Sequence, residues 1–452
     1  MALFSTHHLN PGVKRRELFG WAMYDFANSG YTTVVLTAVF SAYFAGTVAG
    51  RAGWATFAWT AALSVSYAIV MLTMPAIGAL ADLRAAKKRY LAISTIGCVT
   101  ATAALALVGP GDVWLAMVLI VLSNMFYSYG ESLCAAFLPE LAKRDSLGTV
   151  SGWGWSFGYF GGMLALGICL VYVLRAQGQG LNAAQFVPVT MLVTAVIYGA
   201  AALVTFALLK ERAAPQADAL PTGGVAASIA QLMTTIGEAR RYRDFVWLLV
   251  CAVFYQGGVA VAVTLAAIYA EQVIGFKSSE TMVLIFVLNV AAAAGAFGFG
   301  FFQDRIGHKK ALAITLLGWI ATCVIAALST TKGEFWWAAA IAGACMGSSQ
   351  SAGRAMAGMF APEKQLAEFY GLWTFATRLA SIIGPLTYGV ITWATGGNHR
   401  VAILSTAVLF VFGLIALIPV NVARGRAAAE CASAENPFDK LRLSINFKNE
   451  TA

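Results

Sequence analysis

Long apolar stretches, each ended by a charged or glycine- and proline-containing break, run through most of this 452-residue chain. A helix that crosses the hydrocarbon core of a bilayer needs about 20 predominantly apolar residues. The stretches reach that length, so the pattern predicts an all-α membrane protein with twelve transmembrane helices. The predicted helices cover residues 18–48, 55–81, 90–109, 112–139, 149–174, 185–209, 245–271, 280–303, 310–330, 334–361, 366–394 and 400–422.

Composition agrees with a chain that is mostly dissolved in lipid. Hydrophobic residues make up 59% of the sequence and charged residues 11%, whereas a soluble domain has about 25% charged residues. A net charge of +9 would suggest nucleic acid as the partner of a soluble protein, but here the bases lie in loops. We therefore expect membrane lipid, and no nucleic acid, as a partner.

Lysine and arginine are divided unevenly between alternate connections, and this division predicts the orientation. The positive-inside rule places the basic side, with both termini, in the cytoplasm. The basic side holds Lys14, Arg15, Arg16, Arg84, Lys87, Lys88, Arg89, Lys143, Arg144, Arg305, Lys309, Lys310, Arg424 and Arg426. The opposite side holds Arg51, Arg175, Lys277, Lys332 and Arg400.

A long polar stretch at residues 211–244 divides the predicted helices into two sets of six. Its second half spaces four apolar residues along one helical face and then becomes basic, which predicts an amphipathic helix on the membrane surface. These four residues are Ile229, Leu232, Met233 and Ile236. The predicted organisation is a first bundle at 1–210, a linker at 211–244, a second bundle at 245–423 and a cytoplasmic tail at 424–452.

The two sets of helices repeat each other. "GALADLRAAKKR" (Gly78–Arg89) ends the second span and "GFFQDRIGHKK" (Gly300–Lys310) ends the eighth, each with an Asp four residues after a Gly. Pro139-Glu140 and Pro362-Glu363 recur at nearly the same offset. Two pseudo-symmetric six-helix bundles are the architecture of major facilitator transporters, whose signature loop these segments resemble.

The first predicted span narrows the resemblance. "WAMYDFANSGY" (Trp21–Tyr31) is similar to the autophagy-related vacuolar amino acid effluxer family, whose bacterial relatives are called the unknown major facilitator family. The resemblance implies efflux of amino acids or similar small solutes, such as related zwitterions, by a secondary transporter. We expect a monomer in the bacterial cytoplasmic (inner) membrane, and coupling to protons stays open. The signature loop departs from the superfamily pattern in the first half, where Arg84 is shifted and Ala85 replaces Gly.

Polar residues inside the spans are the candidates for solute binding or coupling. In a bilayer such residues must face protein or water, so each is a functional hypothesis by default. In the superfamily the first, fourth, seventh and tenth spans line the central cavity, and most of the candidates lie on these spans. The candidates are Asp25, Asn28, Asn124, Tyr127, Glu131, Gln256, Ser351, Arg354 and Arg378.

The charged candidates are acidic in the first half of the chain and basic in the second half. Asp25 and Glu131 lie in the first half, Arg354 and Arg378 in the second. The residues are either interhelical ion pairs or an amphoteric site for a zwitterion, and the pattern leaves both interpretations open. Because Glu131 and Arg354 each precede a Pro-Glu pair by the same interval, we expect them to face each other, as direct partners or as the two ends of a clamp.

The signature loops predict gate contacts. We expect Asp82 and Asp304, with Arg84 and Arg305 beside them, to hold the cytoplasmic face closed through charge contacts with a neighbouring helix. The alternatives to amino acid efflux are import of another solute, such as a cell-wall fragment or an organic acid, and lipid flipping.

Several motifs are absent from the sequence. It has no G-x-x-x-x-G-K-[ST] motif, so ATP is not the expected driver. Its seven cysteines show no paired spacing, so we expect no disulfide, no metal and no cofactor. No cluster of residues points to catalysis, and we expect no enzymatic activity.

Overall fold

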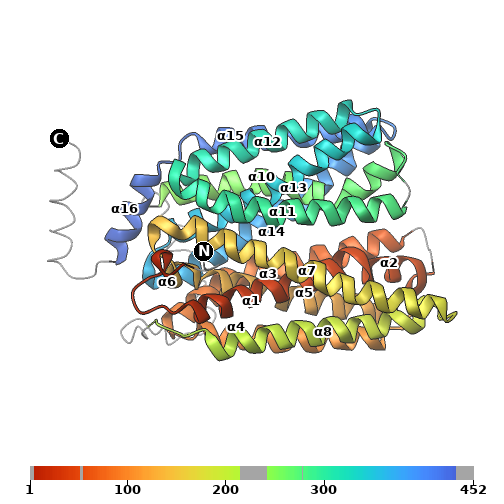
Figure 1. Ribbon diagram of the computed structural model, residues 1–452, viewed down its shortest axis with the longest axis horizontal. Coiled ribbons are helices and arrows are strands. Elements are labelled where there is room, and N and C mark those ends of the chain that lie inside the picture. The colour runs from red at the N-terminus through yellow and green to blue at the C-terminus, as the bar shows by residue number, and fades with distance from the viewer. Residues whose placement is uncertain (1–4, 51–53, 214–241, 277, 434–452) are drawn as a thin grey trace.

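The structure is a computed structural model that describes residues 5–50, 54–213, 242–276 and 278–433. In this part of the chain the architecture is helical, and two bundles lie side by side (Figure 1). The amphipathic helix predicted at 229–236 and most of the tail lie outside the described residues.

The first bundle begins with a long interrupted helix. α1 (Arg15–Tyr31) continues through the wider π-helical turns of η2 (Thr32–Ala38) and η3 (Phe44–Val48), with the short α2 (Phe40–Tyr43) between them. The other helices of this bundle are α3 (Ala55–Leu83), α4 (Lys87–Ala104), α5 (Val113–Ala135), the short α6 (Leu138–Leu141), α7 (Leu147–Gly178) and α8 (Ala183–Leu208).

The second bundle repeats this order and adds a terminal helix. Its helices are α10 (Arg243–Gln272), α11 (Ser278–Ile306), α12 (His308–Leu328), α13 (Lys332–Phe360), α14 (Leu366–Ala394), α15 (His399–Leu417) and the short α16 (Val422–Ser433). α16 and the N-terminal residues lie at the same end of the molecule (Figure 1). We call this end, which also carries the α3–α4, α6–α7 and α11–α12 connections, the basic end.

Ten of the described helical segments are long and apolar enough to cross a membrane. α13 and α14 fall below that hydropathy because they carry polar residues that lie buried between helices, among them Ser351, Arg354 and Thr374. Buried polar groups lower the hydropathy of a helix without exposing it to lipid. Together with the solved structures described below, this arrangement confirms the predicted fold class of twelve transmembrane helices in two bundles.

Local contacts repeat between the bundles. Lys88 donates from its Nζ to the carbonyl of Leu209, where α8 ends, and Lys309 donates in the same way to the carbonyl of Val420 (2.8 Å), beyond the end of α15. Each lysine thus supplies a cation to the unsatisfied carbonyls at the end of the sixth long helix of its bundle. The duplication seen in the sequence is therefore also a duplication of contacts.

Close backbone approach joins the two bundles near the basic end. α3 packs against α14, and α7 packs against α11. A Cβ atom at Gly78 would lie 2.2 Å from the carbonyl oxygen of Ala367, and one at Gly300 would lie 3.0 Å from that of Gly148. Glycine at these two matching positions lets the bundles meet closely enough for the polar contacts described next.

Candidate functional site

The first ion pair between the bundles joins Asp25 of α1 to Arg354 of α13. Nη1 of Arg354 lies 2.8 Å from Oδ2 of Asp25, and the side chains are only 7% and 12% exposed respectively. Arg354 also donates from Nε to Oγ of Ser151 (3.0 Å) and from Nη2 to the Ser151 carbonyl (2.8 Å). The rings of Trp21 and Trp155 lie 4.9 and 5.2 Å from the guanidinium carbon. Each nitrogen of this guanidinium therefore has a partner, and the contact is closed.

A glycine of α7 makes room for this pair. A Cβ atom at Gly154 would lie 2.4 Å from Oδ2 of Asp25 and 2.6 Å from Nη2 of Arg354. Real Cβ atoms do not approach so closely, so any side chain at 154 would displace the pair. The glycine ridge of α7 thus serves a polar contact as well as helix packing.

The second ion pair joins Glu131 of α5 to Arg378 of α14. This pair is more open, since the Glu131 side chain is 33% exposed and that of Arg378 is 12% exposed. The guanidinium carbon of Arg378 lies 5.5 Å from the ring of Tyr67 and 5.8 Å from that of Tyr127. Its Nε is buried and has no hydrogen-bond partner.

These pairs contradict one of the two expected arrangements, in which Glu131 and Arg354 are direct partners. Matching positions in the repeat give the two residues matching places in their bundles, but depth alone does not select a neighbour. α5 packs against α14, and α13 packs against α7. Arg354 is accordingly held by Asp25 and Ser151, and Glu131 by Arg378.

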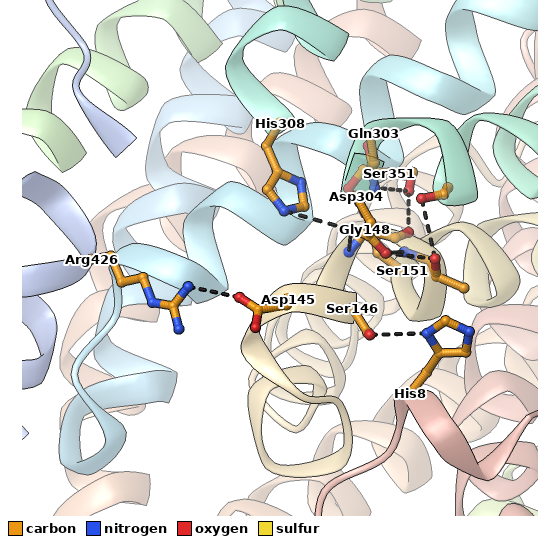
Figure 2. Close-up of polar contacts among 12 residues, drawn as sticks. His8, Asp145, Ser146, Gly148, Ser151, Gln303, Asp304, His308, Ser351 and Arg426 are labelled. Carbon is orange, nitrogen blue, oxygen red and sulfur yellow. Dashed lines mark hydrogen bonds and ion pairs between the residues drawn. The ribbon is translucent and has the colours of Figure 1, made fainter. Parts of the chain in front are cut away.

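Asp304 and Asp82 each bind the N-terminus of a helix in the opposite bundle. Oδ1 of Asp304 accepts from the backbone N–H of Gly148 (3.0 Å), and Oδ2 accepts from that of Thr149 (2.8 Å) (Figure 2). Oδ2 of Asp82 accepts from the backbone N–H of Glu368 (3.0 Å) in the first turn of α14. A carboxylate at this position satisfies free N–H groups and interacts favourably with the helix dipole. The expected contact with a neighbouring helix is present, but it is made to backbone N–H groups.

The arginines of the signature loops do not take part in these contacts. Arg305 is exposed, and Arg84 is also exposed, with Tyr90 of its own bundle 3.5 Å away. Buried basic side chains, Lys87 and His308, take their place, and no sequence pattern distinguishes them from the other bases of these loops. Lys87 is 1% exposed and pairs with Glu140, while its Nζ lies 3.9 Å from Asp82.

His308 occupies the corresponding place in the second bundle. Its Nε2 lies 3.6 Å from Oδ1 of Asp304, four residues earlier in the chain at the end of α11 (Figure 2). The duplicated carboxylates therefore have different basic side chains as neighbours, a lysine beside Asp82 and a histidine beside Asp304.

The other candidates divide between the bundle interiors and the interface. Asn28 accepts from the Tyr198 hydroxyl (2.8 Å) and Asn124 donates to Ser66 (3.0 Å), so both lie within the first bundle. Gln256 donates to Gln350 within the second bundle (2.6 Å).

Two candidates lie at the interface itself. The carbonyl of Ser351 accepts from Ser151 across the interface (3.0 Å), which places Ser351 with the Asp25–Arg354 pair. Tyr127 stacks on Tyr31 (5.1 Å) and also faces Arg378.

Both described chain ends reach across the basic end. In α16, Arg426 pairs with Asp145 (2.7 Å; Figure 2) and Glu430 pairs with Arg144 (2.9 Å), although α16 belongs to the second bundle. Among the described residues, the cross-bundle hydrogen bonds and ion pairs that we identify all lie toward this end. The basic end is thus held closed.

The N-terminal segment also docks at the basic end. Nδ1 of His8 lies 2.9 Å from Oγ of Ser146, directly before α7 (Figure 2), and the His8 ring packs edge-on against Trp153 and Phe301. Partial burial, with the nearby charges of His7 and Lys143, lowers the pKa of His8 below its ordinary value of 6.5. Neutral His8 is therefore favoured in the docked segment.

Solved structures show which class of protein has this fold. The chain superposes on the transporter FucP in its outward conformation with a TM-score of 0.69, at 18% identity over 90% of this chain and 98% of that chain. It superposes on a bacterial homologue of the iron transporter ferroportin, in the outward-facing state, with a TM-score of 0.66, at 14% identity over 90% of this chain and 99% of that chain. The protein is an integral multi-pass membrane protein with the major facilitator fold.

The sequence comparisons specify the family within that class. The profile of the family described as "Vacuole effluxer Atg22 like" matches residues 55–149 and 146–430, so the chain belongs to this family. It is 28% identical over 404 residues to "Uncharacterized MFS-type transporter YxiO" of Bacillus subtilis (strain 168), covering 88% of this chain and 93% of that protein. It is 25% identical to autophagy-related protein 22-1 of Penicillium rubens over 47% of this chain and 38% of that protein. The protein is a secondary transporter and not an enzyme.

Proposed function

We propose that this transporter exports amino acids or related zwitterions across the bacterial cytoplasmic membrane by alternating access, with proton coupling. The observation that carries the proposal is the division of charge between the bundles. The acids Asp25 and Glu131 lie on the first bundle, the bases Arg354 and Arg378 lie on the second, and both pairs cross the interface. The direction of transport rests on the family description and on the fungal relatives.

Because the acids lie on one bundle and the bases on the other, movement of the bundles changes how strongly the acids bind a solute or a proton. Trp21 donates to the carbonyl of Cys134 (2.8 Å), and the Tyr24 hydroxyl contacts Gly130, so α1 and α5 bring Asp25 and Glu131 to a similar level. If the bundles separate at the basic end, both bases withdraw from this pair of acids. Two neighbouring carboxylates without their bases then favour the uptake of a cation, which is either a proton or an ammonium group.

The basic residues of the loops support an orientation of the protein in the membrane. The basic end carries Lys14–Arg16 and the bases of the α3–α4 and α11–α12 connections, and we propose that it faces the cytoplasm. The described structure then corresponds to a transporter closed on the cytoplasmic side. In this orientation protons from outside and solute from the cytoplasm reach these two neighbouring acids in alternation.

Proteoliposomes test the proposal. Purified protein is reconstituted with a mixture of labelled amino acids inside, and counterflow and pH-driven movement are measured. We expect exchange of at least one amino acid, and we expect Asp25→Asn to abolish pH-driven accumulation while exchange persists. Exchange of organic acids or muropeptides alone would favour an importer of another solute, and movement of labelled lipid alone would favour a flippase.

A further inference from the structure

We infer that the Glu131–Arg378 pair is the solute-binding pair, which receives the carboxylate of a zwitterion on Arg378 and its ammonium group on Glu131. The Asp25–Arg354 pair then closes the basic end and does not bind solute. This inference rests on the proposed function and assigns its site. It separates two ion pairs that join the same bundles and that carry the same charges in the sequence.

Hydrogen-bond satisfaction distinguishes the two arginines. In Arg354, Nε, Nη1 and Nη2 all donate, to Ser151 and to Asp25. In Arg378, Nη2 donates to Glu131 but the buried Nε has no partner. A guanidinium presents its donors as a planar fork that matches a carboxylate in two places. Arg378 retains a free donor for such a carboxylate, whereas Arg354 has none on Nε.

Access and space distinguish the two acids. The Glu131 side chain is 33% exposed, against 12% for Asp25, so Glu131 is the more accessible of the two acids. Asp25 also has α7 directly against it, because even a single carbon added at Gly154 would lie 2.4 Å from its Oδ2. A solute cannot enter between Asp25 and Arg354 without moving α7.

Two tyrosine rings complete the open site. Tyr67 of α3 and Tyr127 of α5 lie on the guanidinium of Arg378, at 5.5 and 5.8 Å from its central carbon. Aromatic faces attract both guanidinium and ammonium groups and also offer apolar surface. An amino acid between Glu131 and Arg378 therefore meets a ring face for its ammonium group and apolar area for its side chain.

The paired charges explain why both ends of the solute are required. A zwitterion that enters between Glu131 and Arg378 gives each of them a new counter-ion, so no charge is left alone. An amine would pair with Glu131 and leave Arg378 unpaired, and a carboxylic acid would do the reverse. An unpaired charge at a largely desolvated site costs several kcal/mol in general, which corresponds to about 100-fold or more in affinity.

Binding of matched ligands tests the assignment. The purified full-length protein in nanodiscs is screened by thermal shift with the proteinogenic L-amino acids. Each amino acid that binds is then compared by calorimetry with the amine that lacks its carboxylate and the acid that lacks its ammonium group. We expect both analogues to bind wild type at least about 100-fold more weakly than the amino acid.

Substitution of either charged residue should remove the requirement for the solute group that this residue binds. Arg378→Gln leaves Glu131 without its base, so the amine should bind this variant as well as or better than the amino acid. Glu131→Gln should remove the discrimination against the acid in the same way. Arg175→Gln is the matched control, because Arg175 is exposed at the far end of α7, and it should keep wild-type selectivity.

The outcomes separate this inference from the proposed function. Unchanged discrimination in Arg378→Gln, with the amino acid still bound and transported, overturns the site assignment and leaves the proposed function standing. Failure of every amino acid to bind or exchange with folded wild-type protein overturns the proposed function itself. If Arg378→Gln does not fold, Arg378→Lys keeps the charge without the fork, and undiminished amino acid affinity in that variant also overturns the assignment.

Discussion

Gly154→Ala should open the basic end of the transporter. The added Cβ would lie 2.4 Å from Oδ2 of Asp25, 2.6 Å from Nη2 of Arg354 and 2.6 Å from the Trp21 ring, whereas carbon contacts are ordinarily about 3.5–4.0 Å. Asp25 and Trp21 belong to the same bundle as Gly154, so they can adjust in any state of the transporter. Arg354 belongs to the other bundle, so its clash is relieved when the bundles separate.

The size of the effect follows from this difference. Overfilling a packed site typically costs about 1–3 kcal/mol, and complete loss of a buried pair would cost about 3–5 kcal/mol. The part that distinguishes the closed from the open state is the contact with Arg354, so we expect a bias of about 1–3 kcal/mol toward the open basic end. That bias corresponds to a population change of about 5- to 150-fold.

Cysteine accessibility measures this population. Ser132 is 2% exposed and donates to the carbonyl of Tyr370 across the interface (3.1 Å), so Ser132→Cys reports separation of the bundles. Cys345 and Cys431, the native cysteines that are not buried in the described chain, are first replaced by serine. A maleimide applied from the basic end should label Ser132→Cys faster in the Gly154→Ala background.

Gly167→Ala is the matched control for this measurement. Gly167 lies on the same helix, and apart from that helix's own nearby backbone and the adjacent residues no atom lies within 4 Å of the position of its Cβ. Both substitutions gain the same helix propensity, about 1 kcal/mol, so their difference isolates the contact with the ion pair. Equal labelling in Gly154→Ala, Gly167→Ala and the unsubstituted background would refute the reasoning.

Three further predictions concern the basic end and use the same cysteine reporter or hydrogen exchange. Asp304→Asn removes the negative charge from the N-terminus of α7, a contribution of about 0.3–2 kcal/mol, and should raise labelling by up to about 30-fold; an unchanged rate would remove Asp304 from closure. Arg426→Asp should raise labelling up to about 5-fold, because exposed ion pairs contribute about 0.2–1 kcal/mol. Adding Asp145→Arg restores opposite charges and should reverse the rise. A double variant labelled as fast as the single variant would contradict a direct pair. The pKa of His8 is lowered on docking, so docking should weaken as the pH falls below 6.5 and the undocked segment takes up a proton. Amide exchange of the N-terminal peptide should then rise in wild type but not in His8→Gln. Amide exchange that does not depend on pH in wild type would contradict this prediction.

Much of the fold could be predicted because its determinants are local in the sequence. The length of an apolar stretch decides whether a helix spans a bilayer, and the repeated Gly-x-x-x-Asp segments mark corresponding helix ends in the two bundles. Asp82 and Asp304 were identified from this repeat alone. The contacts that these two residues make involve backbone N–H groups of α14 and α7, which no pattern of side chains reveals.

The pairing of charges could not be predicted in the same way. The repeat gives the position of Arg354 along its helix, but its partner depends on which helices of the two bundles meet. A helix rises about 1.5 Å per residue, so Arg354 lies about 9 Å and Arg378 about 18 Å from the basic ends of α13 and α14. Arginine and glutamate have long side chains, which can bridge a difference in depth between their helices. Arg378 therefore pairs with Glu131 although it lies further from the basic end than Arg354 does.

The different roles proposed for the two pairs give the transporter a means of coupling binding to movement. On the proposed assignment, a zwitterion replaces the attraction between Glu131 and Arg378 with two separate contacts to itself, and so removes one cross-bundle ion pair. The Asp25–Arg354 pair and the carboxylates at the starts of α7 and α14 still hold the basic end closed. A ligand can shift an equilibrium only by its differential affinity for the two states. Solute that arrives from outside therefore weakens one of several contacts and leaves the basic end closed. Protonation of Asp25 removes the charge that holds Arg354 and so favours opening of the basic end. On the proposed export, outside protons thus open the basic end to the cytoplasm, where solute then binds, and the two are exchanged in alternation.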